Sequence, residues 1–193
     1  MHDIQKKYKI ILASQSPRRQ QLLKGLGLQF DVQPLDVDET WPAHLKHKEI
    51  AVYLSELKAH AFDLSTCRNC LVITADTIVW LDQQVMPKPK DRDEAFAILS
   101  KLSGREHEVI TGVTLRTTEK TESFCSITKV FFKELSEAEI DYYIREFQPF
   151  DKAGAYGVQE WIGFIGIDRI EGSYFNVVGL PVKELYDALE KIK

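Results

Sequence analysis

Short apolar runs alternate with helical patterns along the first half of the chain, and this alternation constrains the fold most. Residues 8–13 (YKIILA) and 71–81 (LVITADTIVWL) are apolar enough to form buried strands. Segments 17–27, 46–63 and 91–104 carry helical signals: apolar residues at helical spacing, capping residues at the start, or a glycine that can close the helix. Such alternation is typical of an α/β fold in which at least some strands pair in parallel.

The second half adds a different pattern. Two longer strands are expected at about 107–117 and 122–133, and the turn at 118–121 favours an antiparallel hairpin. Residues 136–147 begin with a capping box and form a helix, and a last helix begins at about residue 182. We therefore expect an elongated mixed sheet flanked by helices.

Composition narrows the class of protein. The chain has 193 residues, of which 44% are hydrophobic and 28% are charged, so it can bury a core and is not disordered. Its net charge of −4 gives no basic field for nucleic acid. No apolar run approaches the ~20 residues that span a bilayer, and the N-terminal run is shorter than the ~7–15 residues of a signal-peptide core. We expect one cytoplasmic domain over residues 1–193, formed of two lobes that share a cleft, with no nucleic-acid or membrane partner.

Two arginines stand at an unfavourable place in the stretch LASQSPRRQQLL. Ser16 is a good N-cap and Pro17 a good first helical residue, so Arg18 and Arg19 fall in the first turn. Cations there typically cost ~0.3–1 kcal/mol, because the helix N-terminus already carries partial positive charge. A bound phosphate chain would reverse this penalty, since free amides and guanidinium groups both bind phosphate oxygens. The alternative is that both arginines reach solvent and pair with nearby acids.

Asp76 interrupts an apolar strand. An ionised carboxylate without a partner costs several kcal/mol to bury, so we expect Asp76 where the strand ends or kinks beside a cleft. There it can hold a metal ion or accept a proton from water, although hydrogen bonds to backbone amides are the simpler alternative. The acidic loop DVDETW contains Glu39, and carboxylates gathered near Asp76 would suit Mg²⁺ or Mn²⁺. A solvated turn is the alternative for this loop.

Two lysines are placed where they can reach a bound anion. Lys58 lies at the edge of the apolar stripe of its helix, so it can extend either into a cleft or into water. Lys88 stands between Pro87 and Pro89, which stiffen its loop and lower the entropy lost on pairing. Lys90 is the alternative to Lys88 as the anion-binding lysine of this loop, and solvent exposure is the alternative for all three lysines.

The three cysteines do not predict a disulfide framework. Cys67 and Cys70 form a lone C-x-x-C that precedes a strand and lacks a second pair at zinc spacing. We expect both as thiols of a surface loop, and Cys125 as a core residue.

Seven stretches together resemble one family, the Maf-like nucleotide pyrophosphatases. They are LASQSPRRQQLL, ITADTIV, PKP, LSGREHEVITGV, LSEAEIDYYI, DKAGAYGVQ and GSYFNVVGLP, in the family's order and at its spacing, from about residue 9 to 186. The resemblance implies an ITPase-like α/β fold with two lobes around a central cleft. It also implies divalent-metal-dependent hydrolysis of nucleoside triphosphates to the monophosphate and pyrophosphate, a house-cleaning role in nucleotide metabolism, and a possible homodimer.

The family's motifs assign roles to individual residues of this chain. Asp76 matches the proton acceptor, and the metal ligands are expected to be Glu39 and Asp76. The remaining roles are substrate choice, for Arg18, Thr77 and Gln159, and phosphate binding, for Ser14, Ser16, Arg19, Lys58 and Lys88.

Within the family, S-P-R-R, A-D-T and D-K-A-G-A-Y-G-x-Q resemble the dTTP/UTP pyrophosphatase type. The 7-methyl-GTP type has S-P-W-R-R and S-D-Q instead. One departure is Glu160, where the first type usually has glycine. The alternatives are a 7-methyl-GTP or broad modified-nucleotide pyrophosphatase, and a nucleotide-binding regulator of septum formation without turnover.

Overall fold

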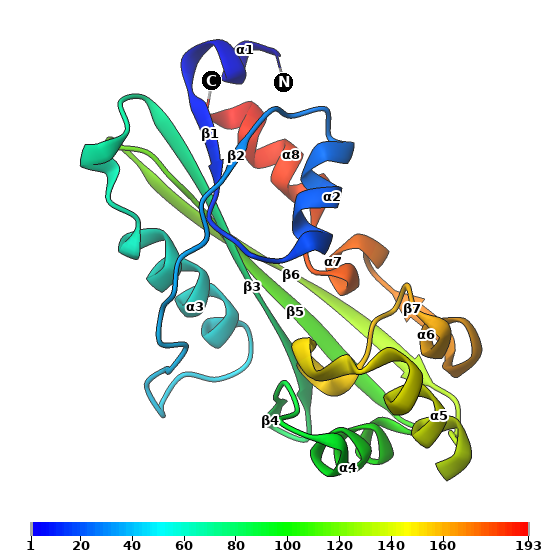
Figure 1. Ribbon diagram of the computed structural model, residues 1–193. Coiled ribbons are helices and arrows are strands. Elements are labelled where there is room, and N and C mark those ends of the chain that lie inside the picture. Colours follow the sequence, from blue (N-terminus) through cyan, green and yellow to red (C-terminus); the bar gives the residue numbers. More distant parts are fainter. Residues whose placement is uncertain (1, 193) are drawn as a thin grey trace. The chain divides into compact units, whose positions relative to one another are not determined.

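A computed structural model describes residues 2–192 and contains a seven-stranded sheet (Figure 1). The strand order is β2-β1-β3-β5-β6-β7, and β4 pairs with β3 outside this path. The strands are β1 (Lys9–Leu12), β2 (Asp31–Val32), β3 (Cys70–Leu81), β4 (Gln84–Met86), β5 (Glu106–Arg116), β6 (Thr121–Phe132) and β7 (Ile167–Glu171).

The sheet is mixed, as the sequence predicted. β1 pairs in parallel with both β2 and β3, whereas β4 pairs antiparallel with β3 and β7 antiparallel with β6. β5 and β6 are neighbours joined by a tight turn, in which the Thr117 N–H donates to the Lys120 carbonyl at 2.8 Å. The expected hairpin is therefore present.

Eight α-helices occur within the described residues, and none of them is long and apolar enough to cross a membrane. They are α1 (His2–Lys7), α2 (Pro17–Gly25), α3 (Lys48–Ala61), α4 (Arg92–Leu102), α5 (Glu137–Phe147), α6 (Trp161–Gly166), α7 (Tyr174–Val178) and α8 (Val182–Lys191). Short 3-10 turns lie at Leu64–Thr66, Pro149–Asp151 and Ala153–Ala155.

The chain divides into two compact units, which we describe separately. Unit 1 comprises Met1–Asp76, Thr111–Ser126 and Gly179–Lys193, and unit 2 comprises Thr77–Ile110 and Ile127–Val178. The division falls inside three strands, β3, β5 and β6.

Unit 1 uses the two faces of its strands differently. On β3, Leu71, Ile73 and Ala75 belong to the apolar cluster that also contains residues of α2 and α8. Val72 and Thr74 therefore face the other way, because successive strand residues point to opposite faces. That second face carries α3, to which the Thr74 hydroxyl donates at 2.7 Å, on the carbonyl of Ser55.

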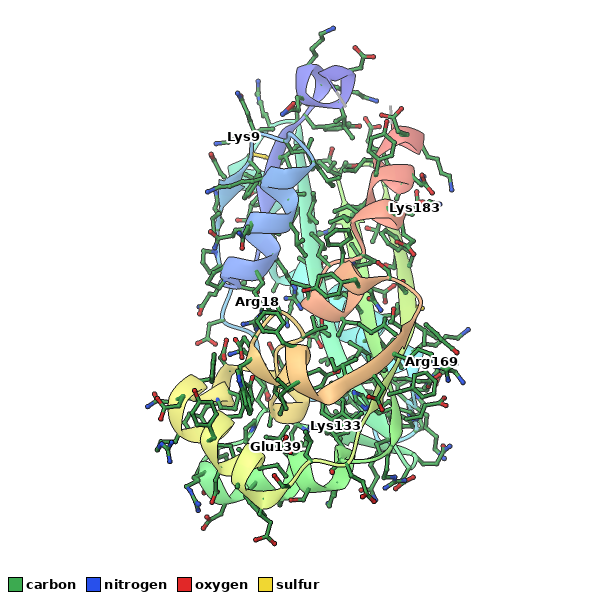
Figure 2. All side chains as sticks on the ribbon, turned by 90° about the vertical axis from the view of Figure 1, so that its right-hand side faces the viewer. Lys9, Arg18, Lys133, Glu139, Arg169 and Lys183 are labelled. Carbon is green, nitrogen blue, oxygen red and sulfur yellow. A yellow bond between two sulfur atoms is a disulfide. The ribbon has the colours of Figure 1, made fainter. Side chains whose placement is uncertain are left out.

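Unit 2 has its own apolar core, built from the second half of β3, from β4, and from α4, α5 and the glycine-rich stretch before α6. Its helices begin where the sequence predicted. The Asp91 side chain caps α4 by accepting the Glu94 N–H at 2.9 Å, and the Ser136–Glu139 capping box opens α5. Lys133 approaches Glu139 of this box at 2.8 Å (Figure 2).

Four elements of unit 2 were not predicted: β4, α6, α7 and β7. All four are short, of three to six residues, and β7 has an irregular register against β6 between Phe131 and Phe132. Segments this short carry too little periodicity to be assigned from one sequence.

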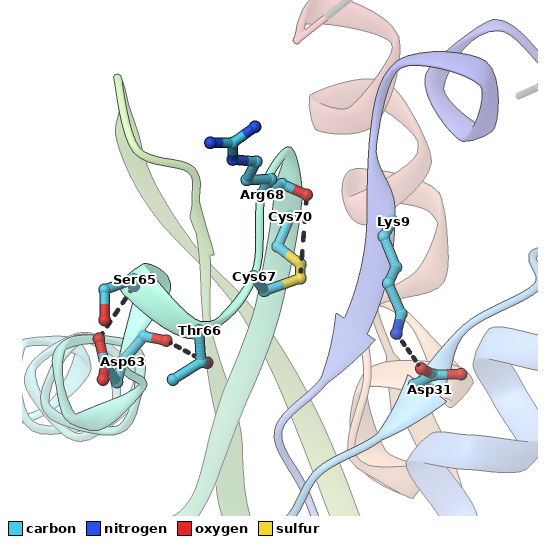
Figure 3. The surroundings of a disulfide bond; sticks show 8 residues. All are labelled: Lys9, Asp31, Asp63, Ser65, Thr66, Cys67, Arg68 and Cys70. Atoms are coloured by element: carbon cyan, nitrogen blue, oxygen red, sulfur yellow. Dashed lines mark hydrogen bonds and ion pairs between the residues drawn. A yellow bond between two sulfur atoms is a disulfide. The ribbon is translucent and has the colours of Figure 1, made fainter.

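The structure contradicts two expectations about the cysteines, namely that Cys67 and Cys70 are free loop thiols and that Cys125 is a core residue. Cys67 and Cys70 are joined as a disulfide with a Cα–Cα distance of 5.8 Å, so they are not free loop thiols (Figure 3). Cys125 is a free thiol but only half-buried on β6, so it is not a core residue. Burial raises the pKa of the Cys125 thiol.

Candidate active site

The turn between β1 and α2 is built around two serine hydroxyls. The Ser16 side chain caps α2 by accepting the N–H of Arg19 at 3.4 Å, and Pro17 follows as the first helical residue. Ser14, which is buried, accepts the N–H of Ser16 at 3.3 Å. The turn is therefore held by its own side chains, as the sequence predicted from the cap and the proline.

Arg19 folds back over this turn. Its Nε donates to the carbonyl of Gly179 at 2.9 Å, and its Nη1 donates to Ser14 Oγ at 3.3 Å. The guanidinium of Arg19 is therefore directed toward the turn. The alternative expectation from the sequence, that it reaches into solvent, does not hold for Arg19. Arg18 precedes Arg19 in the first turn of α2, and Figure 2 labels its position.

Asp76 lies in the middle of a continuous strand. β3 runs from Cys70 to Leu81 without a break, so the expectation that the strand ends at Asp76 is wrong. Strand alternation places Asp76 on the same face as Thr74, which is the face covered by α3. Asp76 is 7% exposed, and a partner from that helix compensates the burial of its carboxylate.

That partner is Lys58 on α3. Its ammonium contacts the Asp76 carboxylate and also lies 2.7 Å from Glu39 Oε1. The Lys58 side chain is 13% exposed, whereas that of Glu39 is 43% exposed. Lys58 therefore points toward the face of β3 and not into water, which was one of the two possibilities left open by the sequence.

A chain of hydroxyl contacts fixes α3 on the sheet and thereby places Lys58. Ser55, one turn before Lys58, contacts the Thr114 hydroxyl at 2.8 Å, and Thr114 contacts Ser123 at 3.0 Å. Thr74 donates to the Ser55 carbonyl from the neighbouring strand. Buried polar groups with satisfied hydrogen bonds specify one arrangement, so the position of Lys58 is well defined.

The C-terminal end of α3 is held by a cation that the sequence did not indicate. Arg116 Nη1 donates to the carbonyls of Ala59 at 2.7 Å and Phe62 at 3.0 Å. A cation is favourable here because the last carbonyls of a helix carry partial negative charge. Nothing in one sequence links Arg116 to a helix that ends more than fifty positions earlier.

The charges of unit 1 influence one another. Burial lowers the pKa of the Arg19 guanidinium from its usual value. The Asp76 and Glu39 carboxylates act in the opposite direction, while Arg18 adds to the lowering. The two arginines, two carboxylates and Lys58 therefore form one electrostatic cluster beside the Ser14–Ser16 turn.

The donor set of this cluster fits a divalent cation. Asp76 and Glu39 approach the same ammonium nitrogen, so both carboxylates already converge on one positive charge. Mg²⁺ is usually held by one or two carboxylates together with substrate phosphates and water. Among residues 2–192 no group of three or more His, Cys, Asp or Glu could hold a metal ion.

Three predicted site residues belong to unit 2. Thr77 follows Asp76 on β3 and is half-buried, and Gln159 is half-buried in the loop before α6. Lys88 is exposed in the loop after β4, where the carbonyl of its neighbour Pro87 accepts the Gly154 N–H at 3.1 Å. The loop of Lys88 is thus attached to the glycine-rich stretch. The cleft shared with unit 1 stays a prediction.

The family model of the Maf-like proteins matches residues 9–192. This chain belongs to the Maf-like family. The match covers the stretch on which the sequence resemblance depended, and it includes all ten residues for which roles were predicted.

Relatives of this Maf-like protein are similar along its whole length. A protein of Phocaeicola vulgatus named dTTP/UTP pyrophosphatase is 56% identical over 187 residues, covering 96% of this chain and 97% of that protein. A Bacteroides thetaiotaomicron protein of the same name is 53% identical with the same coverage. One from Flavobacterium psychrophilum is 53% identical over 178 residues, covering 92% and 91%.

A solved structure shows the same fold. The Ham1 protein of Staphylococcus aureus matches with a TM-score of 0.54 at 17% identity, covering 96% of this Maf-like chain and 100% of the Ham1 chain. At this identity the likeness concerns the fold alone. The ITPase-like mixed α/β sheet expected from the sequence is confirmed.

Proposed function

We propose that this protein is a nucleoside triphosphate pyrophosphatase that hydrolyses dTTP and UTP to the monophosphate and pyrophosphate. The observation that carries the proposal is the contact of one ammonium, that of Lys58, with both Asp76 and Glu39 beside the Ser14–Ser16 turn. The full-length relatives named dTTP/UTP pyrophosphatase support the choice of substrate.

The arginines and the serine turn are proposed to bind the phosphates. Arg19 is already positioned by Ser14 and Gly179, so little side-chain entropy remains to be lost when it meets a phosphate oxygen. Guanidinium groups bind phosphate through two parallel hydrogen bonds. The triphosphate would also remove the penalty of two cations at the N-terminus of α2.

Glu39 and Asp76 are proposed to hold the divalent cation, Mg²⁺ or Mn²⁺. When bound, the ion would polarise the α-phosphate and lower the pKa of a coordinated water. Lys58 contacts both carboxylates and offsets part of their negative charge.

Asp76 is proposed as the proton acceptor for the attacking water. Its burial and its place in a rigid strand hold the carboxylate in one geometry, and general-base catalysis typically contributes ~10²–10⁴ in rate. Most of the remaining acceleration is expected from positioning and charge neutralisation, as in other phosphoryl transfers.

The residues of unit 2 receive their roles from the family's motifs. Lys88 is proposed to bind phosphate, and Thr77 and Gln159, with Arg18 of unit 1, to select the base. The Gln159 side chain offers one donor group and one acceptor, which suit the imide edge of uracil or thymine.

A nucleotide panel tests the proposal. Equal concentrations of dTTP, UTP, dCTP, dGTP and 7-methyl-GTP are incubated with the protein and Mg²⁺ or Mn²⁺, and the phosphate products are identified. We expect pyrophosphate from dTTP and UTP in preference to the others. Preferred turnover of 7-methyl-GTP would contradict the pyrimidine assignment, and binding without turnover would favour a regulatory protein.

A further inference from the structure

A buried cluster in unit 2 surrounds the carboxylate of Glu160. Tyr143, fully buried on α5, donates its hydroxyl proton to Glu160 and accepts the Gly157 N–H at 3.0 Å. The ammonium of Lys152 lies 3.1 Å from Glu160 Oε1. Tyr143 of α5 and Lys152, which lies between two 3-10 turns, thus both contact one carboxylate at the start of α6.

The contact with Lys152 is charged and shielded from water. The Lys152 side chain is 9% exposed, and its other partner, Asp151 at 2.7 Å, is 58% exposed. Glu160, at 21%, is the more buried of the two carboxylates. Removal of one partner from a buried ion pair is costly because it leaves an uncompensated charge. Lys152 therefore fixes the direction of the Glu160 side chain.

The side chain of Glu160 does not cap its own helix. It occupies the N-cap position of α6, yet within the described residues its side chain makes no capping hydrogen bond there. The carboxylate instead turns back to α5. Burial, and then the hydrogen bond to Glu160, raise the pKa of Tyr143 well above its ordinary value, so this phenol stays a donor at any physiological pH.

The same cluster touches Gln159 through Gly157. A Cβ added at Gly157 would lie 2.7 Å from Cδ of Glu160 and 3.0 Å from Nε2 of Gln159, so both side chains pack against this glycine. The Glu160 N–H donates to the Gly157 carbonyl at 3.0 Å and closes a tight turn around Gln159. The arrangement of this turn therefore depends on where Tyr143 holds Gly157 and Glu160.

We infer that Glu160, held by Tyr143 and Lys152, is a positioning residue that fixes the 157–160 turn and thereby the Gln159 side chain that selects the base. The inference rests on the proposed function, in which Gln159 hydrogen-bonds the pyrimidine. A site built to hydrogen-bond its substrate discriminates well only when its polar groups are held in place.

The test compares E160G and Y143F, which remove the contacts, with E160Q, which keeps an acceptor for Tyr143. The ratio of kcat/KM for dTTP and UTP to that for dCTP and dGTP is measured for each. We expect E160G and Y143F to raise KM for dTTP and UTP by about threefold to tenfold, as for one lost neutral hydrogen bond, with kcat nearly unchanged. E160Q should retain more of the discrimination than E160G, because its amide oxygen still accepts from Tyr143 and only the charge that pairs with Lys152 is lost. The matched control is E171Q, at an exposed glutamate of β7, which should change nothing.

A double variant separates the inference from the proposed function. If Glu160 acts through Gln159, E160G adds no further loss of discrimination to Q159A. Additive losses, or an unchanged E160G where Q159A loses discrimination, overturn the inference. No turnover of dTTP or UTP by the unaltered protein, or full discrimination in Q159A, overturns the proposed roles instead.

Amide hydrogen exchange tests whether Glu160 holds the 157–160 turn in place, and it needs no nucleotide. Amides in a peptide covering residues 156–163 should exchange faster in E160G and Y143F than in the unaltered protein and in E171Q. Unchanged exchange in both variants would contradict the positioning role, whatever the substrate.

Discussion

The ammonium of Lys58 on α3 joins the buried carboxylate of Asp76 on β3 to the more exposed carboxylate of Glu39. One ammonium thus forms ion pairs with two carboxylates, of which one is buried and the other more exposed. Loss of Asp76 leaves Lys58 with Glu39, whereas loss of Lys58 leaves two carboxylates without their shared partner. This asymmetry makes Asp76 the position at which chemistry can be tested with least damage to the fold.

Exchange of Asp76 for Asn should abolish turnover while the protein stays folded. Asn has the shape of Asp but cannot accept the proton of the attacking water, so a loss of ~10²–10⁴ in kcat is expected. Lys58 retains Glu39 as a partner, so no buried charge is left unpaired. Pyrophosphate release and a circular-dichroism melt check the two parts of the prediction.

The matched control for this exchange is Asp82→Asn. Asp82 is an exposed aspartate in the β3–β4 turn that pairs with Arg105, and it should tolerate the change. Near-normal turnover in D76N would refute the role of Asp76 as the base.

Removal of divalent metal should stop turnover. EDTA is expected to abolish pyrophosphate release, and added Mg²⁺ or Mn²⁺ to restore it. Glu39→Gln should raise the metal concentration needed for half-maximal rate by about tenfold, since second carboxylate ligands strengthen hard-cation binding. Asp38→Asn, at the exposed neighbour in the same loop, is the control and should leave the metal requirement unchanged. Full activity in EDTA would exclude the proposed metal role.

Two serine caps allow stability to be separated from phosphate binding. Ser16→Ala removes the acceptor for the Arg19 N–H and should cost about 1 kcal/mol of unfolding free energy. Ser136→Ala removes the corresponding cap of α5 and should cost a similar amount. Only S16A should also raise KM for the nucleotide, because only that cap belongs to the proposed phosphate turn. Equal kinetic effects of both variants would mean that Ser16 acts through stability alone.

The sequence predicted those parts of the molecule that depend on local signals. Ser16, Pro17 and the Ser136–Glu139 box predicted the helix starts. The apolar run around Asp76 indicated a carboxylate too costly to bury without a partner, and the strand end expected for that reason is wrong. The identity of that partner came only from the structure. Lys58 meets Asp76 because two strand-face hydroxyls, Thr74 and Thr114, hold α3 on the sheet.

Long-range pairing was beyond the sequence for a physical reason. Arg116 donates hydrogen bonds to carbonyls at the end of α3, and Tyr143 donates one to Glu160. In both cases the two residues are far apart in the chain. Neither has a local pattern. Glu160 departs from the glycine that is usual at this position of the motif, but no local pattern identifies Tyr143 and Lys152 as its partners.

α3 approaches β5 so closely at Gly112 that no side chain fits there, and a substitution at this position tests the contact. A Cβ at this position would lie 2.2 Å from the carbonyl oxygen of Ala51, which is much shorter than any tolerated contact. Gly112→Ala should therefore push α3 outward, cost about 1–3 kcal/mol or more in unfolding free energy, and lower activity through Lys58. Gly25→Ala, at the end of α2 where the added Cβ meets nothing within 4 Å, is the control and should be neutral or stabilising. Urea unfolding of both variants measures the difference, and equal stability would contradict the tight approach.

His107 should make the protein less stable as the pH falls below about 6.5. It is buried, with its ring packed edge-on against Phe132 and Tyr156 and Nε2 lying 2.8 Å from the Tyr156 hydroxyl. Burial lowers its pKa to about 3, whereas an unfolded histidine has a pKa of about 6.5.

Between these two pKa values the unfolded chain binds a proton that the native protein excludes, so acid favours unfolding. The unfolding free energy should then fall by up to ~1.4 kcal/mol per pH unit from this residue alone. His107→Gln should flatten that slope between pH 5 and 7, above the usual range of carboxylates, while His44→Gln, at an exposed histidine, should not. Urea unfolding at several pH values measures the slopes. Identical slopes in H107Q and the unaltered protein would show that His107 does not stay neutral in the native state.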